Sequence, residues 1–376
     1  MSKVLVNESS LTGIADAIRG KNGSADTYKP SEMAAAITAI SGGGGSGGPD
    51  IPDSAFVLSG ECNYWDYNGK WDKFITAYAD KWSTSNIIDA SNMFHKCKLA
   101  QIPFEINLGN YPILASMFAD SNITTLPTII GNNVVVQSIS SFLNYSKVKS
   151  IPNDYFNFIG DVYDSWTNLG NMFNACKYLR NFPTSVNILP MKSKTTSSYS
   201  SFYYSMCSGC YVLDEITNLA VNTTLTYKSN VFDSTVKMCY RLKNFTFEAG
   251  KTVNWKNQTI DLTKVGYGLR DDDALSAGIP TSKKVYDDAT YQALKDDPDW
   301  YASSSAMAYS RYNHDSAVAT INSLPDTSAY LAANGGTNTI KFKGASGSAT
   351  DGGAISSLTP EEIAVATSRG WTVSFV

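Results

Sequence analysis

Few side chains in this chain of 376 residues could support nucleophilic chemistry, and the only histidines are His95 and His314. A cysteine–histidine nucleophile needs both groups within hydrogen-bond reach and a third group that orients the base. His95 and Cys97 are close in the sequence. However, Cys97 occupies a recurring position that also accepts serine, which indicates a small side chain packed against a neighbouring backbone. We therefore do not expect a nucleophilic pair here.

The segment CSGC, from Cys207 to Cys210, has the spacing of a redox or zinc half-site. A structural zinc ion needs four ligands, and Cys239 is the only other nearby candidate. Six cysteines in a chain of this length are too few for a disulfide scaffold. We therefore interpret most of the cysteines as buried free thiols.

Paired carboxylates could hydrolyse a glycan, and Glu61, Asp66 and the run at 271–273 are candidates. The sequence gives no separation in space for them, and the run at 271–273 lacks the alternating ligands of a calcium loop. The stretch GGGGSGG lacks the Gly-Lys-Ser/Thr ending of a phosphate-binding loop. We expect no catalytic residues, no metal site and no cofactor, and therefore no enzyme.

The composition restricts the partners. Lysine and arginine form no cluster and the formal net charge is -4, so binding to nucleic acid is disfavoured. No run of 18 apolar residues exists, so we expect no membrane span. The N-terminal MSKVLVNESS does not have the pattern of a signal peptide, so we expect synthesis in a cytoplasm without secretion by that route.

A motif recurs through the middle of the chain. Its copies begin with SNMFHKCKLAQIP at Ser91 and continue with ASMFADSNITTLP, SSFLNYSKVKSIP and GNMFNACKYLRNFP; SSFYYSMCSGCYVLDEI and SNVFDSTVKMCYRLKNF are longer variants. The apolar residues that we take as anchors are Met93, Met117, Phe142, Met172, Phe202 and Val231, separated by 24, 25, 30, 30 and 29 residues. Each motif also carries an apolar pair three residues apart, such as Leu99 with Ile102.

A single motif cannot bury its own apolar face, so neighbouring copies must cover one another. We therefore predict an α+β repeat solenoid of about six units, with a small helical N-terminal module and an α/β C-terminal cap. The solenoid spans residues 91–250, and the Met-Phe turn is expected to be a short helix. An aromatic stretch at 51–90 is the N-terminal cap, and residues 251–376 form the C-terminal cap region.

Residues 1–41 are predicted to form the helical N-terminal module. Leu11, Ile14 and Ile18 have helical spacing that ends at Gly20, and Met33 and Ile37 lie in a second short helix. Two helices this short bury little alone, so we expect them to attach the chain to another protein. A hairpin packed on its own chain is the alternative. Residues 42–50, with GGGGSGG, form a flexible linker.

The region after residue 250 has clear local signals. Helices are predicted at 288–294, at 303–308, and from Ala317 to Leu324, where Pro325 closes the helix. A strand is predicted around Ile340. Thr359 is the expected N-cap of a helix that Gly370 stops, and Trp371 begins a final strand.

Three stretches resemble known proteins. The repeats resemble the irregular, BspA-like class of leucine-rich repeats. SSLTGIADAIRGKNGSADTYKPSEMAAAI is similar to a module of structural proteins from phages of Gram-positive hosts. INSLPDTSAYLAANGGTNTIKFKG with LTPEEIAVATSRGWTVSF resembles the end of phage and prophage proteins that carry such repeats. The resemblance implies a virion protein, most often a tail fibre or receptor-binding component.

Tyrosines crowd the later repeats and suit recognition of a protein or a sugar on the host surface. The candidate receptor-binding residues are Tyr199, Tyr203, Tyr204, Tyr211, Tyr227 and Tyr240. The candidate residues for virion attachment are Leu11, Ile14, Ile18, Met33 and Ile37. We expect a multicopy or homo-oligomeric protein of the phage tail, made in the bacterial cytoplasm, whose residues 1–41 bind other virion proteins. A structural decoration of the virion and a bacterial surface adhesin remain the alternatives.

Overall fold

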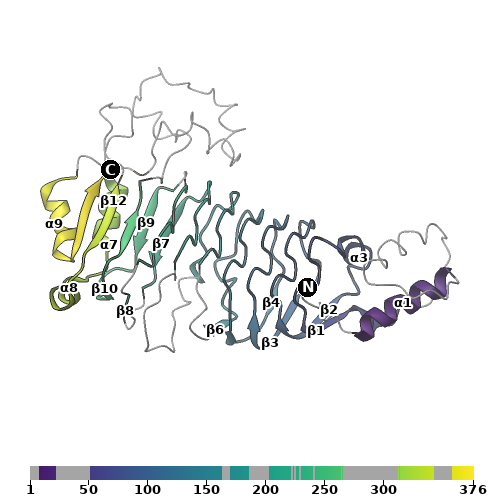
Figure 1. Cartoon of the computed structure of the whole chain (residues 1–376). Coiled ribbons are helices and arrows are strands. Elements are labelled where there is room, and N and C mark those ends of the chain that lie inside the picture. Colours follow the sequence, from purple (N-terminus) through teal and green to yellow (C-terminus); the bar gives the residue numbers. More distant parts are fainter. Residues whose placement is uncertain are drawn as a thin grey trace, which may run out of the picture.

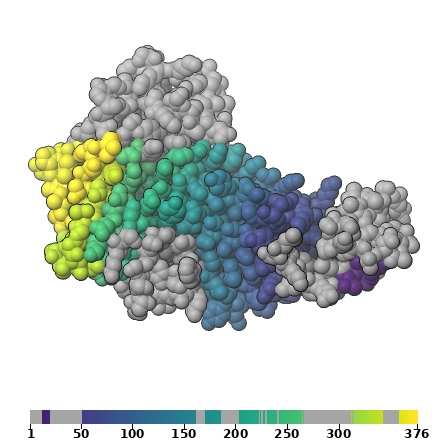
Figure 2. All heavy atoms as spheres, in the orientation of Figure 1, coloured from purple at the N-terminus to yellow at the C-terminus, as the bar shows by residue number. Residues whose placement is uncertain are grey.

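The chain forms small parallel sheets and few helices in a computed structural model (Figure 1). The structure describes residues 8–22, 51–162, 170–185, 203–221, 226–227, 230–239, 242–263, 314–342 and 358–376, with residues 223, 265 and 312. Coils of chain lie side by side from β1 at one end to β13 at the other, and Figure 2 shows them as one continuous, elongated body. The helices predicted at 31–40, 288–294 and 303–308 lie outside the described residues.

Every strand pair among the described residues is parallel, as expected when the chain returns in the same direction after each coil. The largest sheet has the order β1-β2-β3-β4, with strands Val57–Glu61, Ser83–Asp89, Ile106–Ile113 and Ile129–Ile130. Two-stranded sheets pair β5 (Val134–Val136) with β6 (Ile159–Val162), β7 (Glu215–Leu219) with β9 (Asn244–Phe247), and β8 (Thr226–Tyr227) with β10 (Asn254–Trp255).

A six-residue segment recurs beside these strands, and we call it the ladder turn. The described copies are residues 64–69, 92–97, 116–121, 141–146, 171–176, 205–210 and 234–239. Its backbone N–H groups alternate between two kinds of acceptor. In the second copy, Asn92, Phe94 and Lys96 donate to Ala115, Met117 and Ala119 of the next coil, whereas Met93, His95 and Cys97 donate to the residue three positions back. The motif therefore satisfies its own backbone and pairs with its neighbour at once.

The first and fifth positions of the ladder turn have left-handed backbone, with φ between +49° and +75°. Asn92 and Lys96 are one such pair. In a four-residue β-turn, left-handed backbone at the third residue is the signature of type II. Asn92 has this place in the turn from Ala90 to Met93. Left-handed backbone also interrupts an α-helix. The prediction that the Met-Phe segment is a short helix is therefore wrong, because the segment is a series of tight turns.

Side chains at the second, third and sixth positions point inward. The second position holds Trp65, Met93, Met117, Phe142, Met172, Met206 and Thr235, all buried. This alignment corrects two anchors. Met206 and Thr235, rather than Phe202 and Val231, occupy the anchor position, and Phe202 lies outside the described residues. In the last two motifs the anchor therefore precedes the apolar pair by the same interval as in the fourth motif, where Met172 precedes Leu179, and this interval is one residue longer than in the first three motifs.

The stretch predicted as an N-terminal cap contains a ladder turn of its own. Tyr64, Asp66 and Asn68 donate backbone hydrogen bonds to the second coil. The 3-10 helix η1 (Asp53–Phe56) precedes this turn and the short helix α3 (Asp72–Ala77) follows it. Trp65, Trp82 and Phe56 pack together beneath them, with ring centroids 5.1 to 5.3 Å apart.

Helix α1 (Glu8–Asn22) continues past Gly20, where the sequence predicted its end. It lies at the β1 end of the stack (Figure 1) and packs on η1, with an ideal Cβ at Gly13 only 3.6 Å from Ala55. Ile14 and Ile18 are buried. The prediction that these two residues attach the chain to another protein is therefore wrong, because their side chains already pack within this chain. The side chain of Leu11, and both Met33 and Ile37, lie outside the described residues.

The C-terminal residues complete the stack as a sheet of order β11-β12-β13. The strands of this sheet are β11 (Thr259–Asp261), β12 (Asn338–Phe342) and β13 (Trp371–Phe375). The helices of the same region are α7 (His314–Ser323), α8 (Ser328–Asn334) and α9 (Pro360–Ser368). The predicted Thr359 N-cap is confirmed, since Thr359 and Glu362 form a reciprocal capping box. Arg369 donates to the carbonyls of Ile321, Asn322 and Leu324 and so caps the end of α7.

Among the described residues, no helix has the length and apolar character needed to cross a membrane.

We expect substitutions at inward and outward positions of the ladder turn to have different effects on the free energy of unfolding. Phe118 is fully buried and stacks on Phe94 of the preceding coil, with ring centroids 5.5 Å apart. Phe118→Ala should lower the free energy of unfolding by about 3–5 kcal/mol, because it removes buried area and leaves a cavity. Chemical denaturation followed by circular dichroism measures this loss.

Tyr145→Ala is the matched control, because Tyr145 occupies the outward fifth position and is 57% exposed. It should change the free energy of unfolding by no more than about 0.5 kcal/mol. Equal losses in the two variants would contradict the assignment of inward and outward positions.

Candidate functional site

The predicted receptor-binding tyrosines do not form one surface. The prediction that Tyr203 and Tyr227 bind a receptor is wrong, because both side chains are buried. Tyr203 points inward and donates its hydroxyl to the carbonyl of Ala220 at 2.7 Å, and Tyr227 packs against Trp255. Both rings serve the core, where burial of their apolar area stabilises the stack.

Tyr204 and Tyr211 are accessible, whereas Tyr199 and Tyr240 lie outside the described residues. Tyr204 is 41% exposed and directly precedes a ladder turn. The half-buried ring of Tyr211 lies under Lys177, whose Nζ is 5.3 Å from the ring centroid. Tyr211 is therefore already engaged in a cation–π contact within the chain.

Further aromatic side chains lie on the same outward edge of the ladder turns. Tyr64 and Tyr67 come from the first turn and Tyr145 from the fourth. Tyr64 packs on Tyr67, and Tyr67 packs edge-on against His95 of the next coil, with centroids 5.5 and 5.1 Å apart. The sequence did not identify Tyr64, Tyr67 and Tyr145 as surface residues, because residue type alone does not reveal which positions of the turn point outward.

Four of the six cysteines occupy the inward sixth position of a ladder turn. Cys176, Cys210 and Cys239 donate their thiols to a backbone carbonyl of the preceding coil, at 2.9 to 3.0 Å. Burial raises the pKa of all three thiols. A raised pKa leaves almost no thiolate, which is the reactive form. The residues at the sixth position, which we call the cysteine column, therefore serve packing, as the sequence predicted from the alternation of Cys and Ser there.

The CSGC segment follows from the same geometry. Cys207 is at the third position of its turn and Cys210 at the sixth, so both point into the core. They occupy the positions of Phe173 and Cys176 in the preceding coil. Their spacing reflects the repeat, and all six cysteines are free.

The two histidines are not placed for nucleophilic catalysis. His95 packs on Tyr67, and Cys97 directs its thiol to Asp72. His314 contacts Glu362 of α9 at 3.1 Å, and hydrogen bonds to Glu362 and Asp315 raise the pKa of the imidazole. This pair joins α7 to α9 in the C-terminal region.

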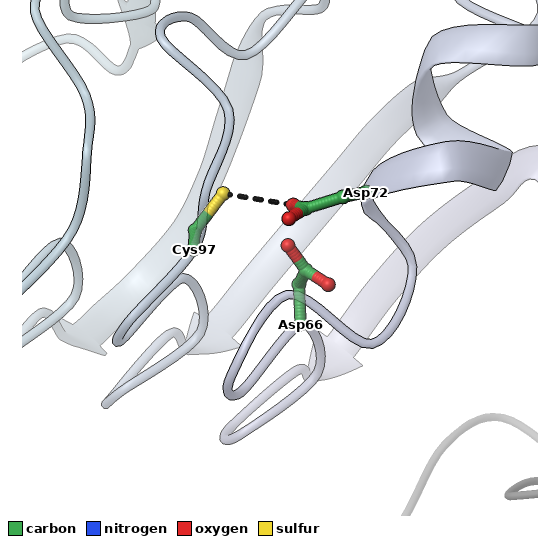
Figure 3. A group of neighbouring side chains, drawn as sticks. All are labelled: Asp66, Asp72 and Cys97. Atoms are coloured by element: carbon green, nitrogen blue, oxygen red, sulfur yellow. Dashed lines mark hydrogen bonds between the residues drawn. The ribbon is translucent and has the colours of Figure 1, made fainter.

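A cluster of Asp66, Asp72 and Cys97 is the one group of potential metal ligands found among the described residues. Figure 3 shows the three side chains converging from three segments. Asp66 comes from the first ladder turn, Asp72 begins α3, and Cys97 ends the second ladder turn. One potential ligand atom from each residue lies within 4.8 Å of the others.

Asp66 is fully buried, although its carboxyl group has few partners. Its Oδ1 accepts a hydrogen bond from the Trp71 backbone N–H at 2.7 Å, and its Oδ2 has no partner. Burial raises the pKa of Asp66 to about 8, and the nearby charge of Asp72 adds to the shift. Burial therefore favours the neutral, protonated form of the Asp66 carboxyl group.

Asp72 connects the first coil to the second. Its Oδ1 accepts the Cys97 thiol at 3.2 Å, and its Oδ2 accepts the Lys98 backbone N–H at 3.1 Å. The carboxylate can enter because Gly69 occupies the sixth position of the first turn, where a Cβ atom would collide with Asp72 Oδ2. Of these residues the sequence identifies only Asp66, as a candidate hydrolytic acid. Asp72 and Gly69 are not recognisable from the sequence, because their proximity to Asp66 depends on the turn.

The state of the thiols gives a direct test of the cysteine column. Burial raises the pKa of Cys62 to about 12 and that of the other five thiols as well. We expect native protein to react very slowly with a chromogenic thiol reagent at mildly alkaline pH, and all six thiols to react in denaturant.

Tyr145→Cys, which places a thiol at an exposed fifth position, should add one rapidly reacting group and is the positive control. Rapid reaction of any thiol in the folded parent chain would show that its burial is wrongly assigned.

No protein-family model, curated protein or solved structure matches this chain.

Proposed function

We propose that this chain is a non-enzymatic bacteriophage virion protein, a tail fibre or receptor-binding protein that attaches to the host cell surface. The resemblance of three stretches supports this proposal: the N-terminal module, the repeats and the C-terminal LTPEEIAVATSRGWTVSF occur here in the order that phage proteins with such repeats have. The low proportion of charged residues, 17%, and the 22 tyrosines suit an extracellular binding surface.

The same proposal includes the fold class. We propose that the coils form a solenoid of irregular leucine-rich repeats. The hydrogen bonds between successive ladder turns support it, because each coil contacts its neighbours and buries the inward positions that no single coil can cover. The first coil and the C-terminal sheet would protect the two ends of the stack.

The observation that carries the binding proposal is the aromatic edge of the ladder turns. We define this edge by Tyr64, Tyr67, Tyr145 and Tyr204, of which Tyr145 and Tyr204 are exposed and Tyr64 and Tyr67 are half-buried. These rings project from a backbone that is held by hydrogen bonds within the turn and by hydrogen bonds to the next coil. Little backbone conformational entropy is therefore lost when a partner binds. Tyrosine also offers both apolar area and a hydroxyl group, which suits a protein or a glycan partner.

Display in several copies would make weak contacts sufficient. A virion that carries many copies converts later contacts into intramolecular events, which increases the apparent affinity without new contacts. Residues 1–41 remain our proposed region of attachment to other virion proteins, although Ile14 and Ile18 take no part because they are buried. The glycine-rich stretch at 42–50 would supply reach.

The proposal is tested by binding of the purified full chain to intact cells of the bacterium that the phage infects. We expect saturable binding and competition with phage adsorption. Replacing Tyr64, Tyr145 and Tyr204 together by Ala should weaken binding at least tenfold, because hot-spot aromatics each contribute about 2 kcal/mol or more.

Tyr111→Ala is the matched control, because Tyr111 is 52% exposed but lies on β3, away from the ladder turns. It should bind as the parent chain does. If the parent chain binds no cells even as an oligomer, the receptor-binding role is wrong, and a structural virion component, such as a head fibre or baseplate subunit, becomes the better proposal.

A further inference from the structure

The first ladder turn departs from the others at its third position. The later turns place Phe94, Phe118, Leu143, Phe173, Cys207 and Val236 there, all inward and buried. The first turn places Asp66 there, equally buried. A carboxyl group in a position otherwise given to apolar side chains costs several kcal/mol of desolvation as an order of magnitude, unless it is well paired. Its presence requires a physical reason.

The hydrogen bonds of Asp66 do not supply that reason. Only the Trp71 backbone N–H forms a hydrogen bond of normal geometry with the carboxyl group, at Oδ1; Oδ2 has none, and the side chains that interact with the carboxyl group are those of Asp72 and Cys97. Buried polar atoms in native proteins are almost always satisfied, and an exception points to a partner such as an ion or a water molecule. Figure 3 shows the carboxyl group of Asp66 beside that of Asp72. The unsatisfied group is thus part of the cluster that Asp72 and Cys97 complete.

Asp72 and Cys97 already have the separation of ligands that share one ion. The Cys97 Sγ lies 3.2 Å from Asp72 Oδ1. Tetrahedral zinc, with a Zn–S distance near 2.3 Å and a Zn–O distance near 2.0 Å, separates two such ligands by roughly 3.5 Å. Gly69 keeps this space free of a side chain, whereas the corresponding position of every later turn holds Cys or Ser.

We propose that Asp66, Asp72 and Cys97 bind a divalent cation of the zinc class, with water as the fourth ligand. The thiol argues against calcium and magnesium, which take oxygen ligands. Asp72 is only half-buried, so its side of the cluster admits solvent. Binding replaces the hydrogen bond between Cys97 and Asp72 with two bonds to the ion. The thiol proton of Cys97 and the carboxyl proton of neutral Asp66 both leave to solvent.

The ion would join three segments at one end of the stack. Asp66 belongs to the first coil, Cys97 to the second, and Asp72 to the helix α3. The terminal coil has a neighbour on one side only, so it gains most from such a link. This site is independent of receptor binding, and its presence or absence does not test the proposed function.

The experiment uses the full chain, freed of metal with a chelator and titrated with Co²⁺ and then Zn²⁺. We expect one Co²⁺ per chain, with a thiolate-to-cobalt charge-transfer band and the strong visible bands of tetrahedral cobalt. Zn²⁺ should displace Co²⁺ and raise the melting temperature. Asp66→Asn and Cys97→Ser should abolish the charge-transfer band and the thermal shift.

Cys239→Ser is the matched control, because Cys239 occupies the same position of the last ladder turn, far from the cluster, and should leave both signals unchanged. Asp66→Asn preserves the shape of the side chain, and circular dichroism of the metal-free variant establishes that it is folded. The proposal is overturned if the parent chain shows no cobalt–thiolate band and no shift with Zn²⁺, or if the band persists in Cys97→Ser. A second combination of results also overturns it: the parent chain binds no metal, and Asp66→Asn has a higher melting temperature than the parent chain. The Asp66 carboxyl group would then be a protonated buried acid and not a metal ligand.

Discussion

The alternation of backbone hydrogen bonds in the ladder turn is the constraint on which the rest of this structure depends. Asn92 and Lys96 adopt left-handed backbone, which costs roughly 1–2 kcal/mol for each residue other than glycine. The turn is stable because alternate N–H groups donate to the next coil and the others close local turns. Each such bond contributes only about 1 kcal/mol net, but an unsatisfied buried N–H would cost more. The stack therefore supports a backbone that an isolated segment would not adopt.

The sequence predicted the units of the stack better than the conformation within them. Apolar pairs such as half-buried Leu99 with buried Ile102 are visible because each motif repeats the same apolar spacing. The helix that begins after Thr359 carries a strong local capping signal. The turn carries no such signal. Its left-handed positions hold Asn, Ser, Lys, Tyr, Asp, Ala, Gly and Met. A Met-Phe pair with both side chains inward has the appearance of one turn of a helix.

The errors of alignment have the same cause. Phe202 and Val231 match the anchor by residue type, but the hydrogen-bond register selects Met206 and Thr235. A threonine is acceptable at this buried position because its hydroxyl donates to the carbonyls of Tyr203 and Phe232. Tyr203 was expected on the surface for a similar reason, since residue type alone does not reveal which way a side chain points. Register, which depends on contacts between coils, decides both cases.

The cluster of Asp66, Asp72 and Cys97 shows how the terminal turn of a repeat can carry different side-chain chemistry. Its backbone also differs at one position, since Gly69 is left-handed with a φ of +66°, unlike the sixth residues of the later turns. In the middle of the stack, the sixth position holds a thiol or hydroxyl, and a carbonyl of the chain accepts the bond of Cys176, Cys210 or Cys239. In the first turn, Gly69 leaves this position open and a carboxylate from α3 enters it. Cys97 then faces two carboxyl groups in place of one carbonyl. The same packing position thus becomes a set of ligands where the stack ends, because only there can a side chain from outside the repeat reach it.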